Sequence, residues 1–543
     1  MEQSLEPPDD IEVLQKLISD LARENQQLKA QNITLSGKNS ILQEQINLLL
    51  HKRFGANTEK YRAEQADLFN EAEAYAEETE VEAVQAEPGA EAAADHADHA
   101  DHADQPADPI NPTPKKPGRK VLPPELPRVE IIHDLPEAQR YCSAGHALKE
   151  IGTEVSEQLD IIPAKVQVLR HIRKKYACPC CLAEVKTAPM PPQPLPKSNA
   201  SPGLLAYIIT SKFLDALPFY RQSKQFQRIG VELSRGTLSL WAIRCGELIQ
   251  ALCNLMQEHL HQYPILQMDE TTLQVLKEEG KAASSQSYLW VQRGGPPDQP
   301  VVLFHYSPTR SQIVADQLLQ GYSGTLQTDG YSGYPAVCAK NGLRHAGCWA
   351  HARRKFDDAL KAQGKAQPKA GKASKALIMI QKLYRIETQI KYLSVDEKHR
   401  IRQQQAVPIL HEIKAWLDIS LTQVAPTSLT GKALGYLANQ WSTLTVYCQD
   451  GRLDIDNNAV ERAIRPFVIG RNNWLFADTI KGAKASANLY SLIETAKLNG
   501  LEPYRYLHHI FKELPKAQTL EDIESLLPWQ VDREHINSGW KNG

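Results

Sequence analysis

The sequence predicts a multidomain α/β protein in which several small modules precede one large mixed domain. A chain of 543 residues exceeds what a single ordinary core accommodates. The first fifty residues carry a heptad repeat, whereas the residues after 262 alternate apolar, strand-like segments with helical ones. Between these regions the composition changes abruptly to acidic and then to proline-rich sequence, which indicates linkers.

Residues 10–52 are predicted to form a leucine-zipper coiled coil. Leucine recurs every seventh residue, at Leu14, Leu21, Leu28, Leu35, Leu42 and Leu49. The residue three places before each leucine is Ile or Asn, and a buried Asn pair favours a parallel dimer in register. The pattern therefore predicts a homodimer; the alternative is a single amphipathic helix that packs on the rest of the protein.

Residues 63–128 are predicted to be a disordered linker. Residues 63–110 contain 15 Asp and Glu and no Lys or Arg, and the His repeat at His96, His99 and His102 within this charged stretch is more typical of a solvated tether than of a metal site. The formal net charge is −2, but 62 basic and 49 acidic residues remain without this segment. A basic body suits a polyanionic partner, although an ordinary soluble surface explains the charge equally well.

The linker ends in a proline-rich, basic segment. Arg119 and Lys120 follow Pro117 and Gly118 there, a pattern similar to the arms that place an Arg in the minor groove of DNA. Short basic runs are common, so this segment alone is weak evidence.

Residues 129–190 are predicted to form a small, zinc-finger-like β domain. Short β-like segments carry four candidate zinc ligands, namely Cys142, His146, Cys178 and Cys181. The two-residue gap in Cys178-Pro179-Cys180-Cys181 lets two thiolates bind one tetrahedral ion, with Cys180 as the spare thiol. The first pair departs from a cysteine knuckle, because Ala144 and Gly145 stand where a second Cys is expected; a metal-free β domain is the alternative.

Residues 200–258 are predicted to be helical and to include a helix-turn-helix. A first amphipathic helix is followed by a turn at Gly230, and Ser234 is expected to cap a second helix that begins with Arg235. In a helix-turn-helix, the start of the second helix contacts base edges, so Ser234 and Arg235 are candidate DNA contacts. A plain pair of packed helices is the alternative.

Residues 262–480 are predicted to form an RNase H-like domain with a helical insertion at about 360–450. Three strand-like segments are followed by GTLQTDGYSGYPAV, and such a sheet places one Asp on its first strand beside another at the end of its fourth. Asp269 and Asp329 occupy these places. Side chains alternate along a strand, so Asp269 and Glu270 face opposite sides, and Asp269 is the candidate.

A third acid is expected because divalent ions at a phosphate must be held from several directions. The candidate is Glu461, on a short helix that Asp456 or Asn457 is expected to cap and Pro466 to end. Asp454 and Asp450 are the rivals. For any single acid, a surface or capping role is the more common one.

Basic residues flank these acids. His351 follows Cys348 at the start of a predicted helix and is a candidate either for the metal site or for a packing histidine. Six basic residues near the acids are candidate phosphate contacts, namely Arg353, Arg354, Lys355, Arg462, Arg465 and Arg471. Residues 481–543 are predicted to be a C-terminal helical region.

The sequence predicts no secretory signal and no membrane span. The N-terminus is acidic, and no apolar run reaches the roughly eighteen residues that a span requires. The nine cysteines suit reduced thiols better than a disulfide framework. A cytoplasmic location is therefore expected.

Several long motifs resemble transposases of the insertion sequence 66 family. They are MDET around Asp269, TDGYSGY around Asp329, CWAHARRKF at 348–356 and NNAVERAIRPFVIGRNNWLF around Glu461. The heptads, the segment that ends at Cys178 and the closing LIETAKLNGLEPYRYL also match, so the similarity covers nearly the whole chain apart from the acidic linker.

This resemblance implies a bacterial DDE-type DNA transposase that associates with the nucleoid. Asp269, Asp329 and Glu461 would then be the catalytic triad holding Mg²⁺ or Mn²⁺ for cleavage at transposon ends and strand transfer into target DNA. Double-stranded DNA would be the partner, the cysteine region a zinc-finger-like DNA-binding domain and the heptads a dimerising zipper. Family members often work with small accessory proteins of the same element.

Two other functions fit the residues. A metal-dependent nuclease needs the same acids but does not join strands. A zipper-dimerised DNA-binding regulator needs the binding modules but has an inactive catalytic fold.

Overall fold

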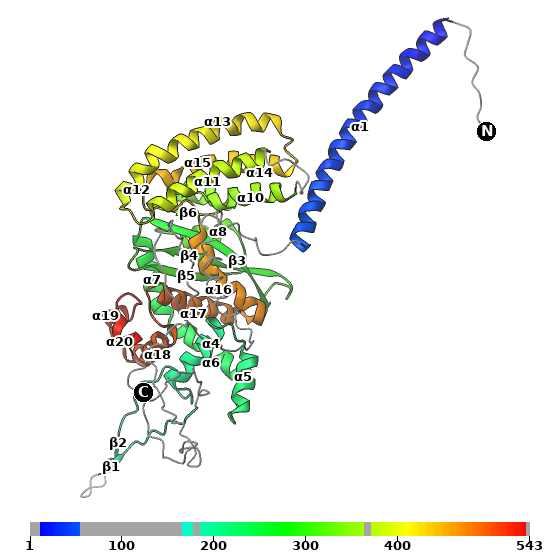
Figure 1. Ribbon diagram of the computed structural model, residues 1–543. Coiled ribbons are helices and arrows are strands. Elements are labelled where there is room, and N and C mark those ends of the chain that lie inside the picture. The colour runs from blue at the N-terminus through cyan, green and yellow to red at the C-terminus, as the bar shows by residue number, and fades with distance from the viewer. Residues whose placement is uncertain (1–10, 55–165, 178–184, 363–370, 539–543) are drawn as a thin grey trace, which may run out of the picture. The chain divides into compact units, whose positions relative to one another are not determined.

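The computed structural model describes residues 11–54, 166–177, 185–362 and 371–538. The chain divides into two compact units, one containing residues 1–84 and 192–537 and the other containing residues 85–191 and 538–543. The sheet, the helices around it and the N-terminal helix belong to the first unit, shown with the rest of the chain in Figure 1.

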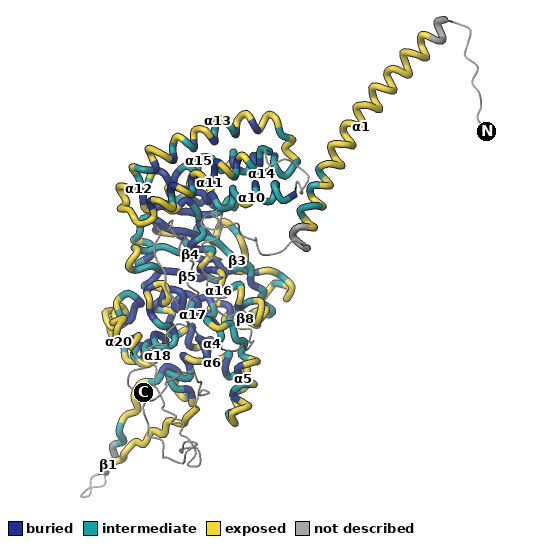
Figure 2. The backbone as a smooth tube through the Cα atoms, in the orientation of Figure 1, coloured by how far each residue is buried: buried dark blue, intermediate teal, exposed yellow. Residues whose placement is uncertain are grey.

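The heptad region forms one long helix, α1 (Ile11–Phe54). Its leucine seam is exposed: Leu21, Leu28, Leu35, Leu42 and Leu49 retain 55 to 66 % of their surface, and the helix is coloured as exposed along most of its length in Figure 2. The predicted helix is therefore confirmed, and these five leucines remain exposed among the described residues, although α1 contacts α10.

The centre of the first unit is a mixed six-stranded sheet. Its strands are β3 (Ile265–Lys277), β4 (Gln286–Gly294), β5 (Val301–Ser307), β6 (Thr325–Gln327), β7 (Arg344–Ala346) and β8 (Ala477–Thr479). The order is β5-β4-β3-β6-β7, with β8 paired to the far end of β3. The first three strands are antiparallel neighbours, whereas β6 and β7 run parallel to β3. These positions confirm the strand-like segments predicted from the sequence.

The outer edge of β5 is covered by a helix. Helix α17 (Ile480–Leu498) directs Ser491 and Thr495 at the backbone of β5: the N–H of Phe304 donates to Ser491 Oγ at 2.8 Å, and Thr495 Oγ1 bonds both the N–H and the carbonyl of Val302. An exposed sheet edge presents unpaired backbone groups, and these hydroxyl groups satisfy them.

The described segment directly before the sheet forms helices α4 (Pro202–Phe213), α5 (Phe219–Arg228), α6 (Arg235–Leu248) and α7 (Gln250–Gln262). Gly230 has a φ of +82°, and the Ser234 hydroxyl accepts the N–H of Thr237 at 3.1 Å. The predicted turn and cap are confirmed. One face of α6 is buried, and a Cβ at Gly246 would lie 2.6 Å from Ala485 on α17, whereas the first turn and the opposite face, with Leu240 and Arg244, are exposed.

A helical region separates β7 from the last helices. It contains α10 (Trp349–Ala362), α11 (Lys372–Ile390), α12 (Val395–Ile401), η2 (Arg402–Ala406), α13 (Val407–Gln423), α14 (Leu429–Asn439), α15 (Trp441–Leu444) and η3 (Val446–Gln449). These helices share a hydrophobic core of their own that includes Trp349, Phe356 and Leu383. The region lies on the β7 side of the sheet, opposite α17 (Figure 1).

Helix α16 (Asn458–Trp474) crosses the sheet and corrects one expectation. Pro466 was expected to end a short helix, but α16 continues through it to Trp474. A proline inside a helix removes a single backbone hydrogen bond. The buried side chains of Val460, Ile464 and Phe467 on both sides of Pro466 hold the helix together across that loss.

The remaining elements are short or terminal. They are α8 (Gln312–Leu318), α9 (Gly333–Asn341), α18 (Pro503–Glu513), η4 (Leu514–Lys516), α19 (Leu520–Glu524) and α20 (Arg533–Asn537). Across the described ranges, no helix is long and apolar enough to cross a membrane.

In the second unit, β1 (Lys175–Ala177) pairs antiparallel with β2 (Val185–Thr187). The hairpin therefore brackets Cys178, Cys180 and Cys181, which fall between its strands. These cysteines, with Cys142, His146, Arg119, Lys120 and the acidic linker, lie outside the described residues.

Candidate active site

Asp269 and Asp329 lie side by side because of the register between β3 and β6. These parallel strands pair Gln267 with Gln327, and the two amides bond each other at 2.9 Å, so both face the same side of the sheet. Asp269 and Asp329 each follow two residues later, on that same side. Asp329 lies just beyond the end of β6, where its Oδ1 accepts the N–H of Tyr331 at 2.9 Å.

Glu461 is brought to the same place by the start of α16. The Asn457 side chain donates to the carbonyl of Met268 at 3.2 Å, immediately before Asp269, and the Asn457 N–H donates to the Cys348 thiol at 3.2 Å. Asn457 is the N-cap residue, but its side chain bonds β3 and makes no cap bond. Asp456 takes that role by accepting the N–H of Asn458 at 3.1 Å. Glu461 follows one turn later, on the first turn of a helix tied to β3.

The electrostatics confirm that these acids are neighbours. Burial raises the pKa of Asp269 to about 8, and repulsion from Glu270, Asp329 and Glu461 adds to the rise. Charged carboxylates that crowd one another destabilise their ionised forms unless a cation is bound between them. The set is therefore a suitable receptor for cations.

Glu270 stays electrostatically coupled to Asp269 and Asp329, although the alternation along the strand predicts that it faces the other side of the sheet. Its carboxylate pairs with Arg310 and accepts the Tyr334 hydroxyl at 2.8 Å. Arg310 also lies 4.2 Å from the Tyr331 ring centre. This network was not predicted from the sequence, because Arg310 lies in a loop far from any recognisable motif.

The rival acids Asp450 and Asp454, and the capping residue Asp456, have other partners. Asp450 forms an ion pair with Arg452 at 2.7 Å. Asp454 Oδ2 lies 3.5 Å from the side-chain nitrogen of Gln267. Gln267 is two residues before Asp269 on β3. Asp456 accepts the Tyr384 hydroxyl at 2.9 Å, and burial raises its pKa to about 6. These contacts support Glu461 as the third acid.

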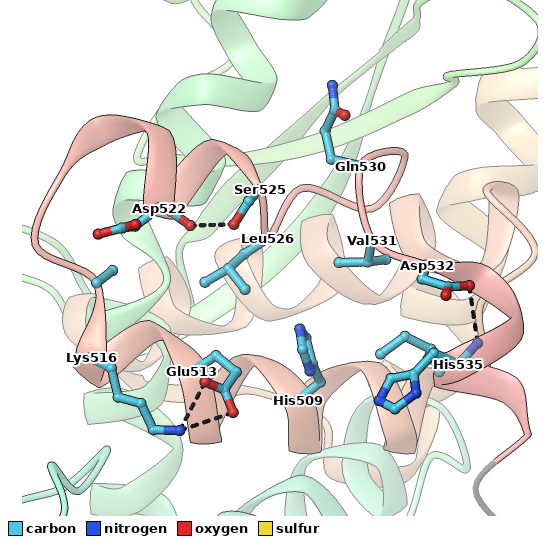
Figure 3. Close-up of a pocket in the computed structure, with 12 residues that line it drawn as sticks. His509, Glu513, Lys516, Asp522, Ser525, Leu526, Gln530, Val531, Asp532 and His535 are labelled. Atoms are coloured by element: carbon cyan, nitrogen blue, oxygen red, sulfur yellow. Dashed lines mark hydrogen bonds and ion pairs between the residues drawn. The ribbon is translucent and has the colours of Figure 1, made fainter.

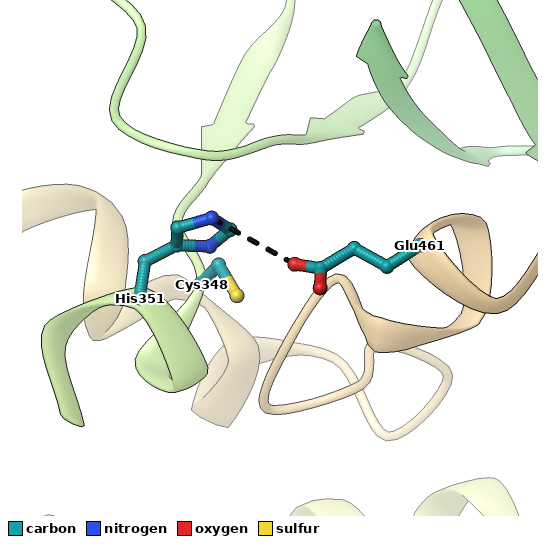
Figure 4. A group of neighbouring side chains, drawn as sticks. All are labelled: Cys348, His351 and Glu461. Atoms are coloured by element: carbon teal, nitrogen blue, oxygen red, sulfur yellow. Dashed lines mark ion pairs between the residues drawn. The ribbon is translucent and has the colours of Figure 1, made fainter. Parts of the chain in front are cut away.

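His351 lies beside Glu461, as the interpretation of His351 as a residue of the metal site requires. Figure 4 shows the imidazole and the carboxylate facing each other, with Cys348 next to them. Their Nε2 and Oε1 atoms are 3.7 Å apart. Burial lowers the pKa of His351, and the charge of Glu461 opposes that shift. The three side chains offer ligand atoms within 4.8 Å of one another.

The predicted phosphate contacts fall on two helices, α10 and α16. Arg354 and Lys355 are exposed on α10, and Arg354 lies 3.5 Å from Glu461; Arg353 is partly buried on the same helix. Arg462 and Arg465 are exposed on α16. The structure therefore brings basic residues of α10 and α16 to the carboxylates.

Three predicted contact residues lie apart from this group. Ser234 and Arg235 are exposed at the start of α6. Arg471, in the last turn of α16, donates to the hydroxyl groups of Thr271 and Thr272 at 3.3 and 2.8 Å, which ties α16 to β3.

A separate cavity lies among the C-terminal helices (Figure 3). Residues of α18, α19 and α20 line it, including His509, Glu513 and His535. None of its lining residues belongs to the carboxylate set.

Comparison with known proteins decides the family. Residues 197–485, more than half of the chain, match the model described as Transposase IS66 family. The chain belongs to this transposase family. The uncharacterized protein y4jD of Sinorhizobium fredii (strain NBRC 101917 / NGR234) is 34 % identical over 429 residues, which are 76 % of this chain and 82 % of that protein. The uncharacterized protein y4qI of the same strain is 33 % identical over 430 residues, which are 77 % and 78 % of the two chains.

Three further family matches cover the flanking regions of this transposase-family chain. Residues 491–529 match the IS66 C-terminal element, residues 139–181 the zinc-finger binding domain of transposase IS66, and residues 41–131 the Transposase C of IS166 homeodomain. The resemblance seen in the sequence is confirmed. Membership of a transposase family implies that the chain acts on DNA.

Proposed function

We propose that this chain is a DNA transposase that cleaves DNA at transposon ends and joins those ends to target DNA. The observation that carries the proposal is the convergence of Asp269, Asp329 and Glu461. The strand register supplies the first two, and the bond from Asn457 to β3 supplies the third.

The sheet order supports an RNase H-like catalytic domain. The sheet has three antiparallel strands followed by two parallel ones, and its acids stand on the first strand and after the fourth, as expected from the sequence. The helices between β7 and α16 would be the insertion in that domain, so Glu461 would be separated from Asp329 by a folded helical region.

The donor set fits a hard divalent ion such as Mg²⁺ or Mn²⁺. Three carboxylates offer oxygen ligands, and Glu461 Oε1 is a buried atom without a hydrogen-bond partner among the described residues. When bound, such ions would neutralise charge on the reacting phosphate and lower the pKa of attacking water.

In the proposed reaction a water oxygen bonds to phosphorus at a transposon end, and the bond from phosphorus to the 3′ oxygen breaks. The oxygen of the released 3′-hydroxyl then bonds to the phosphorus of a target phosphodiester, the bond from that phosphorus to the target's own 3′ oxygen breaks, and the departing oxygen takes up a proton, so that one strand is joined and one target 3′-hydroxyl is released. Arg354, Arg462 and Arg465 would hold the DNA backbone beside the acids by charge attraction, with Arg353 and Lys355 extending the basic surface.

The other modules would bind and pair the ends. The exposed first turn of α6 would enter a DNA groove, and the region matching the zinc-finger model would bind Zn²⁺ through Cys142, His146, Cys178 and Cys181. The exposed leucine seam of α1 would dimerise the chain and bring two ends together.

A strand-transfer assay tests this function. Purified protein would be incubated with Mg²⁺, labelled element ends and a target plasmid. We expect joined product from the wild type and from the control Asp298→Asn, which changes an exposed acid outside the site. Asp329→Asn should lower the yield by at least about a hundredfold, because a metal ligand is lost.

The alternatives predict other products. Cleavage without joining would identify a nuclease. Binding of the ends without either reaction would identify a DNA-binding regulator.

A further inference from the structure

The imidazole of His351 and the carboxylate of Glu461 come from different helices and meet without a hydrogen bond. Their Nε2 and Oε1 atoms are 3.7 Å apart, which is too long for a normal hydrogen bond (Figure 4). Two ligands that each lie about 2.1 Å from one ion are roughly 3 to 4 Å apart. The pair is therefore spaced as two ligands of a shared ion would be.

Both side chains have unsatisfied atoms. Within the described residues, Glu461 Oε1 and His351 Nδ1 are buried without a hydrogen-bond partner. A buried polar atom without a partner costs free energy, and a bound cation would remove that cost for the carboxylate oxygen. The side chains nevertheless retain 28 and 22 % exposure, so an ion can reach them from solvent.

Cys348, the third member of the cluster, is not suited to bind the ion. Its thiol is fully buried and accepts the N–H of Asn457 at 3.2 Å. That bond fixes the start of α16, so Cys348 positions Glu461 instead of competing for the metal.

We propose that His351 is a metal ligand of the proposed active site, donating Nε2 to the ion that Glu461 holds. This inference rests on the proposed function. His351 and Glu461 together would give the ion a mixed nitrogen and oxygen donor set. Mg²⁺ strongly prefers oxygen ligands, whereas first-row transition ions accept imidazole. The site therefore selects a transition ion such as Mn²⁺ over Mg²⁺.

Pulsed electron paramagnetic resonance of bound Mn²⁺ tests this proposal, because ¹⁴N modulation reports imidazole coordination directly. The full chain would carry Gln at positions 96, 99 and 102, since the linker histidines are another source of nitrogen. His345→Gln is the matched control: this histidine also lies near Asp329, but its Nε2 is bonded to Thr328 Oγ1 at 2.9 Å.

We expect ¹⁴N modulation in the background protein and in His345→Gln, and its loss in His351→Ala and His351→Gln. Mn²⁺ affinity should fall about tenfold or more in both His351 variants, while Mg²⁺ affinity, measured by competition, changes less than about twofold. Two different His351 substitutions are used so that one folded variant suffices, and a background protein without ¹⁴N modulation would by itself refute the proposal.

Two results would overturn the proposal in different ways. Mn²⁺ binding that requires Glu461 and Asp329 but shows no ¹⁴N modulation would leave the transposase function standing and refute the role of His351. Mn²⁺ binding that is unchanged in Glu461→Gln and Asp329→Asn would refute both.

Discussion

Asp269 is the residue on which the electrostatics of the site depend most. Its carboxyl is buried on β3 among three other acids, and its pKa is raised to about 8. In the unfolded chain an Asp has a pKa of about 3.9. Between these two values the folded protein binds more protons than the unfolded one, so the free energy of unfolding must fall as pH rises.

This dependence of the unfolding free energy on pH gives a prediction for the metal-free protein. Its free energy of unfolding should decline between pH 5 and 8, and Asp269→Asn should reduce that decline, by at most about 1.4 kcal/mol for each pH unit. Urea unfolding at several pH values measures the slopes. Asp298→Asn is the control and should keep the wild-type slope. Equal slopes in wild type and Asp269→Asn would show that this carboxyl is not held at a raised pKa.

Among the elements, α16 is the one whose placement completes the site. Asn457 donates to β3 next to Asp269, and Arg471 bonds the hydroxyl groups of Thr271 and Thr272 further along the same strand. The two ends of the helix are thereby fixed along β3. The position of Glu461 relative to Asp269 follows from these bonds.

Asn457→Ala should therefore weaken both stability and activity. Losing the buried hydrogen bond to Met268 should cost about 1–3 kcal/mol of unfolding free energy. It should also lower strand transfer although every carboxylate remains, because Glu461 loses its fixed position. Asn473→Ala, at an exposed position on the same helix, is the control for both measurements. Full activity in Asn457→Ala would show that the hydrogen bond from Asn457 to the Met268 carbonyl is not needed to position Glu461.

The contact between α17 and β5 leads to a second prediction, which concerns the stability of the β5 edge. Ser491→Ala combined with Thr495→Val removes the hydroxyl groups that satisfy the β5 edge and should lower the free energy of unfolding by about 1–3 kcal/mol. Ser486→Ala is the matched control, because that hydroxyl bonds only the carbonyl of Gly482 in its own helix. Equal stability of the two proteins in urea unfolding would contradict the proposed edge protection.

The elements also show what could be predicted from the sequence. Apolar strand segments, the Ser234 cap and the turn at Gly230 were predicted correctly because each depends on local chemistry. The end of α16 was predicted wrongly at Pro466, because long-range packing of Phe467 and Ile464 outweighs a local helix breaker. The Glu270–Arg310 network depends on a loop position that no local pattern determines.

At the scale of the whole molecule, the site depends on segments that are far apart in the chain. Asp329 and Glu461 are separated by a helical region with its own core, so no spacing rule could join them. Long motifs identified Glu461, and the geometry then supported it over Asp450 and Asp454. The leucine seam of α1 is the other feature at this scale, because it is exposed among the described residues.

Dimerisation through α1 is tested by charge substitution in the seam. Leu28→Glu with Leu35→Glu should convert a dimer into a monomer of 60.8 kDa, as measured by light scattering. Joining of paired ends should fall, whereas Mn²⁺ binding at the carboxylates should persist. Gln27→Glu with Thr34→Glu, off the seam, should remain dimeric. A wild-type protein that is monomeric at micromolar concentration would refute the zipper.

The central claim, that Asp269, Asp329 and Glu461 form one metal-binding catalytic set, is tested most directly by one series of strand-transfer measurements. Asp269→Asn, Asp329→Asn and Glu461→Gln are compared with Asp450→Asn and Asp454→Asn, the acids closest to them in the same motifs. We expect the first three to lose joined product by at least about a hundredfold and the last two to stay within about threefold of wild type. Retained joining in Glu461→Gln together with its loss in Asp454→Asn would contradict the account.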